Sequence, residues 1–130
     1  MPNGESPKKY DLEERTARFG ENIIEFARKL PRNEVTQRII SQLVGCGTAV
    51  GSNYCEADCA ESNKDFIHKM SIANKEAKES KHFLRMAAKA APEHALGARV
   101  LWKEAHELNM IFMTIVRKAK QTEERKKVEN

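Results

Sequence analysis

The chain has 130 residues and a net charge of +4 at pH 7, because 23 Lys and Arg residues outnumber 19 Asp and Glu residues. This length suits one domain with a single core, and the 40% hydrophobic fraction with only four prolines favours a folded helical protein. The apolar runs fall short of the roughly 20 residues of a membrane span, and residues 1–11 lack the apolar stretch of a signal peptide. Three cysteines fit a reducing compartment, so we expect a cytoplasmic protein without a membrane partner.

The first predicted helix follows a polar N-terminal tail at residues 1–10, which we expect to be disordered. Asp11 is a suitable N-cap and Pro31 cannot continue a helix, so these two residues bound the element. Between them, apolar residues recur on one helical face: Leu12, Phe19, Ile23, Phe26 and Leu30.

The second predicted helix, at about residues 33–58, lies in a segment without basic residues, since no Lys or Arg occurs between Arg38 and Lys64. In a chain with 32% charged residues, such a gap indicates a helix buried on more than one side. Glycine costs about 1 kcal/mol per helical position relative to alanine, so Gly47 and Gly51 indicate close approach of another helix. The predicted core positions are Ile39, Leu43, Cys46, Val50, Asn53 and Ala57.

The third and fourth predicted helices have the most regular apolar spacing. Ser62 and Asp65 resemble a capping arrangement for the third helix, and Pro92 suits the first turn of the fourth. The third seam alternates intervals of four and three: Phe66, Met70, Ala73, Ala77, Ser80, Leu84, Ala87 and Ala91. The fourth seam is Leu101, Ala105, Leu108, Phe112, Ile115 and Ala119.

Four helices joined by short connections predict an all-α fold, an up-down-up-down antiparallel four-helix bundle. No strand pattern competes with this interpretation. We expect the bundle domain at residues 11–121 and a polar C-terminal tail that frays at residues 122–130.

Surplus apolar surface on the fourth helix predicts a homo-oligomer. Met110 and Met113 point away from the predicted seam, and exposed apolar patches usually mark interfaces. The small residues of the second helix form another candidate contact. The alternative is a wide core stripe with two adaptable surface methionines. The candidate interface residues are Gly47, Gly51, Met110, Ile111, Met113 and Val116.

Polar residues near the core favour a structural network. Asn53 lies on the predicted seam of the second helix, and Glu56 follows about one turn later. A buried amide must find partners, and we expect Glu79 on the third helix to provide one. A ligand or catalytic site is the less favoured alternative.

The sequence offers no complete metal or catalytic pattern. Glu79 and His82 form one Glu-x-x-His pair, whereas di-iron bundles need two copies and two further glutamates. Cys55 and Cys59 lie one turn apart without two further ligands for zinc. A nucleophile elbow and a Gly-rich phosphate loop are both missing. We therefore expect no enzyme activity and no cofactor.

The sharpest functional candidate is a basic face on the third helix and the C-terminal half of the fourth. Repeated in an oligomer, this face would attract phosphates with little sequence preference, because lysine dominates and aromatic residues are few. A merely solvated helix face is the alternative. The candidate nucleic-acid-binding residues are Lys75, Lys78, Lys81, Arg85, Lys89, Arg117, Lys118 and Lys120.

Residues 50–57, VGSNYCEA, resemble the second-helix signature of a family of small bacterial four-helix bundle proteins. That signature is close to V/I-G-A-N, then an aliphatic residue or tyrosine, then E-A or E-G. The segment from Ser62 to Ile67 resembles the start of the family's third helix, and Glu79 falls where the family carries a glutamate. Ser52 and Cys55 depart from the usual pattern. The family is encoded within intervening sequences of 23S ribosomal RNA and is related to the accessory variability protein of diversity-generating retroelements.

The resemblance spans about residues 12–120 and implies a homo-oligomer, typically a ring of five, without enzyme activity. The retroelement relatives act as basic partners of a reverse transcriptase and of nucleic acid. Two functions therefore compete: an accessory or scaffold protein that binds RNA or DNA backbone, and a protein–protein interaction module that binds no nucleic acid.

Overall fold

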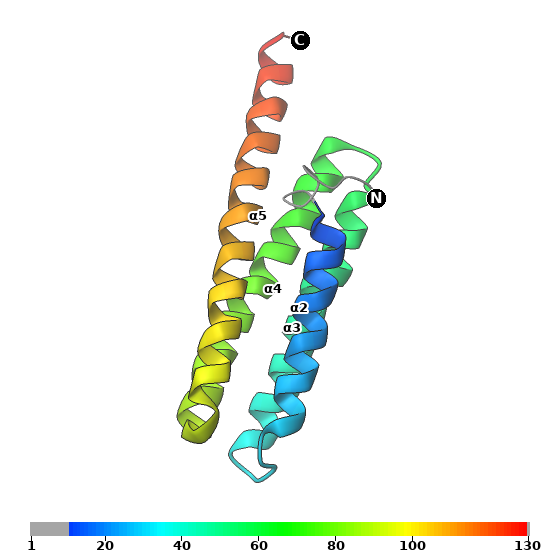
Figure 1. The fold of residues 1–130 in the computed structure, drawn as a ribbon. Helices are drawn as coiled ribbons and strands as arrows, with labels where there is room; N and C mark the ends of the chain where they lie inside the picture. Colours follow the sequence, from blue (N-terminus) through cyan, green and yellow to red (C-terminus); the bar gives the residue numbers. More distant parts are fainter. Residues whose placement is uncertain (1–10, 130) are drawn as a thin grey trace.

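Four long helices form the protein, as predicted, in a computed structural model that describes residues 11–129 (Figure 1). Consecutive helices run in opposite directions, and residues 11–129 contain no strand. The predicted disordered tail, residues 1–10, lies outside the described residues. The elements are α2 (Leu12–Lys29), α3 (Thr36–Asp58), α4 (Asn63–Ala90), the short 3-10 helix η1 (Pro92–His94) and α5 (Ala95–Glu129).

Side-chain caps explain where the helices begin. An Asp11 carboxylate oxygen accepts from the Glu14 N–H at 3.2 Å, and the Ser62 hydroxyl accepts from the Asp65 N–H at 3.0 Å, as predicted. Asn33 Oδ1 accepts hydrogen bonds from the N–H groups of Val35 and Thr36, and α3 begins at Thr36, three residues later than predicted.

The predicted seams form the core. On α4, the seam positions are buried except Phe66, which is half-buried against the core. The largest fully buried side chains include Phe19, Ile23, Leu43 and Phe112, and each comes from a predicted core position. The hydrophobic spacing of the sequence therefore predicts most of the interior, but on α3 Ile40 is buried where Ile39 was expected, and Asn53, Ile115 and Ala119 are only half-buried.

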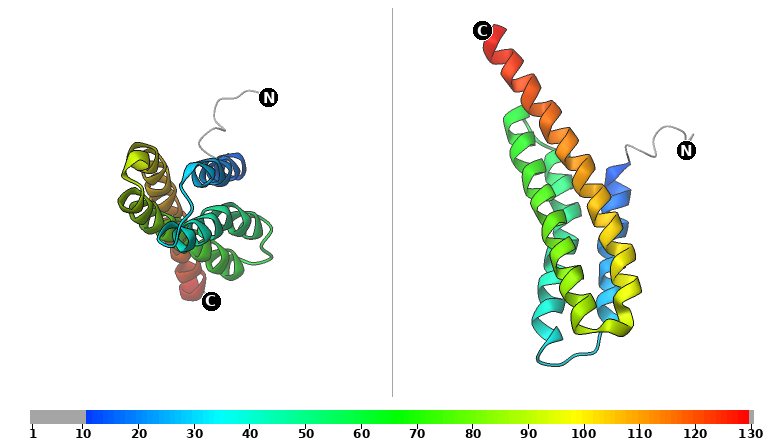
Figure 2. Two further views of the ribbon diagram at one scale, coloured as in Figure 1. Left: turned by 90° about the horizontal axis from the view of Figure 1, so that it is seen from below. Right: turned by 90° about the vertical axis from the view of Figure 1, so that its left-hand side faces the viewer.

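The helices do not pack equally. α4 packs closely against both α3 and α5, whereas α2 packs mainly on α3 and touches α5 little. α5 has 35 residues, and its C-terminal end extends beyond the other helices (Figure 2). None of the helices within residues 11–129 is long and apolar enough to cross a membrane.

The C-terminal segment that we expected to fray continues α5 to Glu129. Contacts with Asn63 at the start of α4 explain why the first part of this segment stays helical. The Asn63 side-chain amide donates to the Ala119 carbonyl at 3.0 Å and to Glu123 Oε1 at 2.7 Å. These bonds dock α5 past residue 121, and the remaining residues follow as a solvated helix.

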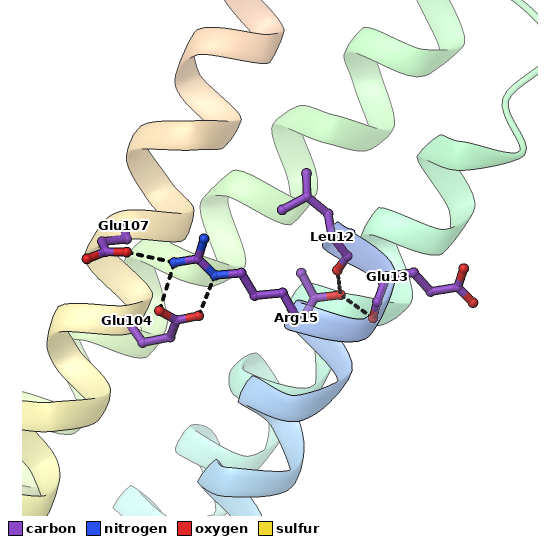
Figure 3. Close-up of polar contacts among 6 residues, drawn as sticks. Leu12, Glu13, Arg15, Glu104 and Glu107 are labelled. Carbon is purple, nitrogen blue, oxygen red and sulfur yellow. Dashed lines mark hydrogen bonds and ion pairs between the residues drawn. The ribbon is translucent and has the colours of Figure 1, made fainter. Parts of the chain in front are cut away.

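An ion pair joins α2 and α5, which otherwise touch little. Arg15 of α2 donates from Nε to Glu104 Oε2 at 2.7 Å and from Nη2 to Glu104 Oε1 at 2.9 Å (Figure 3). Its Nη2 also donates to Glu107 Oε1 at 2.7 Å. The hydrogen bonds that Arg15 donates to Glu104 raise the pKa of Arg15, so the guanidinium stays charged. The pair therefore fixes α2 against α5.

Two glycines of α3 admit α2 of the same chain. A Cβ on Gly47 would lie 2.8 Å from Ile23 Cγ1, and a Cβ on Gly51 would lie 3.2 Å from Thr16 Oγ1. The prediction of a close helix approach is thus confirmed. Because α2 of the same chain covers the buried Gly47, this residue is not accessible as the predicted contact between copies, whereas the half-buried Gly51 stays a candidate.

Candidate nucleic-acid interface

The predicted basic residues lie mostly on the surface. Lys75, Lys78, Arg85 and Lys89 of α4 are exposed, as are the three predicted residues of α5, Arg117, Lys118 and Lys120. The ion pairs found within residues 11–129 use only Arg15, Arg18 and Lys69 as cations. The predicted cations therefore keep their charge uncompensated by a contacting carboxylate.

Three hollows lie on α4 and along its contact with α5. Two of them, of about 390 and 490 Å³, are lined by residues of both helices, and the third, of about 440 Å³, is lined by residues of α4 alone. Seven basic residues line them, against two carboxylates, Glu79 and Glu124. The predicted residues Lys89 and Lys118 are exposed but line none of the three hollows. We call the seven the basic groove: Lys75, Lys78, Arg85, Arg99, Lys103, Arg117 and Lys120.

Arg99 and Lys103 are groove residues that the sequence prediction missed. They lie in the first half of α5, opposite Arg85 of α4, at the 390 Å³ hollow. Their position in the sequence is the available signal, because Arg99 directly follows Ala98 and Lys103 directly follows Trp102, and these two neighbours line the same hollow.

Lys81 does not lie where the prediction put it. It is half-buried between α4 and α5, where its Nζ donates to Asn109 Oδ1 at 3.0 Å and lies 3.1 Å from His106 Nδ1. Burial lowers the pKa of Lys81, and the charge of Lys78 lowers it further. Lys81 is therefore a structural cation of the helix contact, and a phosphate would have to compete for it.

Asn109 and its partners form a polar network that the sequence prediction also missed. The Asn109 amide is buried and donates to Asn74 Oδ1 on α4. His106 stacks on Trp102 with ring centroids 5.2 Å apart, and Lys81 Nζ lies 5.4 Å from the Trp102 centroid. The network fixes α5 on α4 directly beside the basic groove.

The predicted network of Asn53, Glu56 and Glu79 is not brought together. Asn53 is half-buried and donates to the Ala49 carbonyl of its own helix at 2.9 Å, while Glu56 accepts from Lys69 Nζ at 3.2 Å. No hydrogen bond joins Glu79 to either residue within residues 11–129. Glu79 is exposed, and it is the next residue of the helix, the buried Ser80, that contacts α3 through Cys46.

Apolar side chains are exposed along α5. Met110 and Met113 are 42% and 48% exposed, and Met113 also lines the 490 Å³ hollow, whereas Ile111 and Val116 pack half-buried against the core. The structure adds two residues that the sequence analysis did not select, Leu96 at 75% and Val100 at 67%. They lie one turn apart and extend the exposed apolar surface toward the start of α5.

Metal ligands do not gather in the part of the chain that the structure describes, where no group of three His, Cys, Asp or Glu residues could hold an ion. Cys55 and Cys59 are exposed free thiols, and His82 lies in the hollow next to Lys78. The expectation of no enzyme activity stays a prediction.

Comparison with known proteins settles the family. The model of the 23S rRNA-intervening sequence protein family matches residues 8–91. The chain belongs to this family. A crystal structure from the S23 ribosomal protein family of Bacteroides thetaiotaomicron, a protein of unknown function, is 25% identical. The alignment covers 81% of this chain and 97% of that chain, with a TM-score of 0.71.

No match was found among curated proteins. The resemblance stated from the sequence is thereby confirmed at the level of the family and its fold. The family match ends at Ala91, so it includes α2 to α4 and stops before α5. Only the α4 side of the basic groove therefore lies within the matched residues.

Proposed function

We propose that the protein binds the phosphate backbone of RNA or DNA through the basic groove, as a non-enzymatic accessory or scaffold. The observation that carries this proposal is the concentration of seven basic residues on α4 and along its contact with α5, without contacting carboxylates to neutralise them. Phosphate binding by such residues depends on charge and releases counterions. The two packed helices fix the backbone positions of these cations relative to one another.

The proposal includes self-association. Leu96, Val100, Met110 and Met113 expose apolar surface on α5, on a chain that is otherwise rich in charge. Burying this surface against a second copy would remove it from water. The ring of five implied by the family resemblance would also repeat the basic groove around the assembly and multiply its phosphate contacts.

The same apolar surface favours a second candidate function, a protein–protein interaction module that binds no nucleic acid. In that case the residues of the basic groove interact only with solvent. The two functions differ in their response to salt, because phosphate contacts weaken steeply with ionic strength whereas apolar contacts do not.

Fluorescence anisotropy of labelled structured RNA and duplex DNA tests the proposal. The oligomer, with its mass measured by light scattering, is titrated at several salt concentrations. We expect log K to fall linearly with log salt, and the slope to shrink by up to about 0.9 for each phosphate contact removed. The test variant replaces four groove residues by glutamine: Lys75, Lys78, Arg117 and Lys120.

A matched control removes the same charge elsewhere, by glutamine at Arg28, Lys29, Arg32 and Arg38, which are exposed on or beside α2 and α3. Equal losses in both variants would mean that net charge alone attracts nucleic acid, and would refute the groove. No binding of the unaltered protein at low salt would leave the interaction module as the better function.

A further inference from the structure

The 390 Å³ hollow at the start of α5 differs from the rest of the basic groove in having apolar walls. Leu84 and Ala98 are buried and form its floor, and Ala88 and Trp102 form its sides. Its volume lies within the range of roughly 300–1,000 Å³ in which small-molecule sites fall. The hollow can therefore hold a flat, apolar group. A phosphate alone would gain nothing from its apolar walls.

Trp102 is held in place at this hollow. His106, one turn later on α5, stacks on the indole with an interplanar angle of 11°, and neither His106 nor Lys81 lines the hollow. The α5 residues that line the hollow are Ala98, Arg99, Trp102 and Lys103, so the hollow lies mainly toward the N-terminal side of Trp102, whereas His106 follows one turn later. With 36% of its surface exposed, the positioned indole can receive an aromatic partner from the hollow side.

The rim of the hollow carries charge of one sign. Arg85 lies on the α4 side, and Arg99 and Lys103 lie on the α5 side. All three are exposed and none belongs to an ion pair found within residues 11–129. An occupant that complements the site is consequently aromatic at its centre and anionic at its edge, as a nucleotide within a strand is.

We propose that this hollow binds an unpaired base of single-stranded nucleic acid, stacked on Trp102, with the flanking phosphates on Arg85, Arg99 and Lys103. The inference rests on the proposed function and adds to it a preference for single strands. A duplex keeps its bases stacked inside and presents only phosphates to the groove. Base stacking on an aromatic side chain supplies affinity that is independent of sequence, because every base has a π-face.

Trp102 provides its own readout, because it is the only tryptophan of the chain. The native oligomer is titrated with a 12-nucleotide single strand and with an abasic strand of equal length and charge. We expect the first to quench Trp102 emission and to bind about ten-fold more tightly than the second. Equal quenching and equal affinity would overturn the inference.

The second experiment fills the hollow with a larger side chain. Ala88→Leu adds side-chain volume on a half-buried helical position without changing charge, and Ala17→Leu makes the same change at an exposed position of α2. We expect Ala88→Leu to abolish the preference for single strand over duplex, measured by anisotropy of labelled strands, and Ala17→Leu to keep it. A preference that survives Ala88→Leu would overturn the inference.

A variant confined to exposed residues avoids any loss of folding. Arg99→Gln with Lys103→Gln should weaken single-strand binding several-fold and leave the duplex contacts of the distant groove residues nearly unchanged. Binding of duplex and single strand with equal affinity to the unaltered protein would sink the inference while the proposed function stands. If neither duplex nor single strand bound at low salt, both the inference and the proposed function would be overturned. Quenching of Trp102 emission by laurate but by no oligonucleotide would overturn the inference and assign the hollow to an anionic lipid.

Discussion

The α2–α3 contact and the α4–α5 contact join neighbouring helices in different ways. In the first, Gly47 and Gly51 bring two backbones together, and Ile23 fills the space that a Cβ would need. In the second, Lys81 and Asn109 join two closely packed helices by polar side chains, and hollows lie beside this network. A hollow of about 350 Å³ also lies beside Gly51 at the first contact, but it is lined by two glutamates, whereas basic residues line the hollows of the second.

The difference shows where this bundle can acquire a function without losing its fold. Substitutions at a glycine contact act on packing first, because no space is left. Along the α4–α5 line, exposed cations can change while the polar network keeps the helices in place. The following experiments test this division, beginning with the largest expected effect.

Gly47→Ala should destabilise the protein because its Cβ would lie 2.8 and 2.9 Å from two Ile23 side-chain carbons that are fully buried. Overpacking of this kind costs about 1–3 kcal/mol. Gly45→Ala is the matched control, since nothing lies within 4 Å of its Cβ, and the helix should gain up to about 1 kcal/mol. Urea unfolding measures both. Equal shifts of the two variants would show that α2 does not approach α3 as described.

Asn109→Leu should cost about 1–3 kcal/mol, because it leaves Asn74 without its donor and Lys81 Nζ without its carbonyl acceptor. Asn53→Leu is the comparison on α3, where the amide bonds only the Ala49 carbonyl within its own helix, so a smaller loss is expected. Chemical unfolding of both variants decides the order. A larger loss at Asn53 would mean that the α4–α5 network contributes little to stability.

Hydrophobic spacing was sufficient to predict which residues face inward. The α4 seam is buried at nearly every expected position because a repeat of four and three residues fixes the angle of each side chain around its helix. Helix ends followed from Asp11, Pro31 and Ser62, whose capping or breaking chemistry is local. These features need no knowledge of a neighbouring helix.

The candidate site required that knowledge. Spacing placed Lys81 outside the seam but could not tell that α5 covers that flank, since this depends on how two helices cross. A second stripe with intervals of four and three, parallel to the seam of α5, was the available signal: Trp102, His106, Asn109, Met113, Val116 and Lys120. Each of these residues lines a hollow or joins the network beside α4.

Arg15→Gln should cost about 0.5–1 kcal/mol, since Arg15 and Glu104 are only about one-third exposed and paired through two bonds. Arg18→Gln, which breaks the exposed pair with Glu14 one turn earlier, should cost less. A double-mutant cycle of Arg15→Gln with Glu104→Gln isolates the interaction. A coupling energy of zero would show that α2 is held by α3 alone.

The smallest effect is a pH dependence that belongs to the α4–α5 contact. Since burial lowers the folded-state pKa of Lys81 below its ordinary value of 10.5, the unfolded chain binds this proton more readily than the folded one. Stability from this group therefore rises with pH between the lowered pKa and about 10.5. Lys81→Met should remove that rise, whereas Lys118→Met at an exposed position should keep it. Unfolding free energies measured between pH 8 and pH 10.5 test the difference. Parallel curves for Lys81→Met and the unaltered protein would show that Lys81 is exposed to solvent, as the sequence predicts.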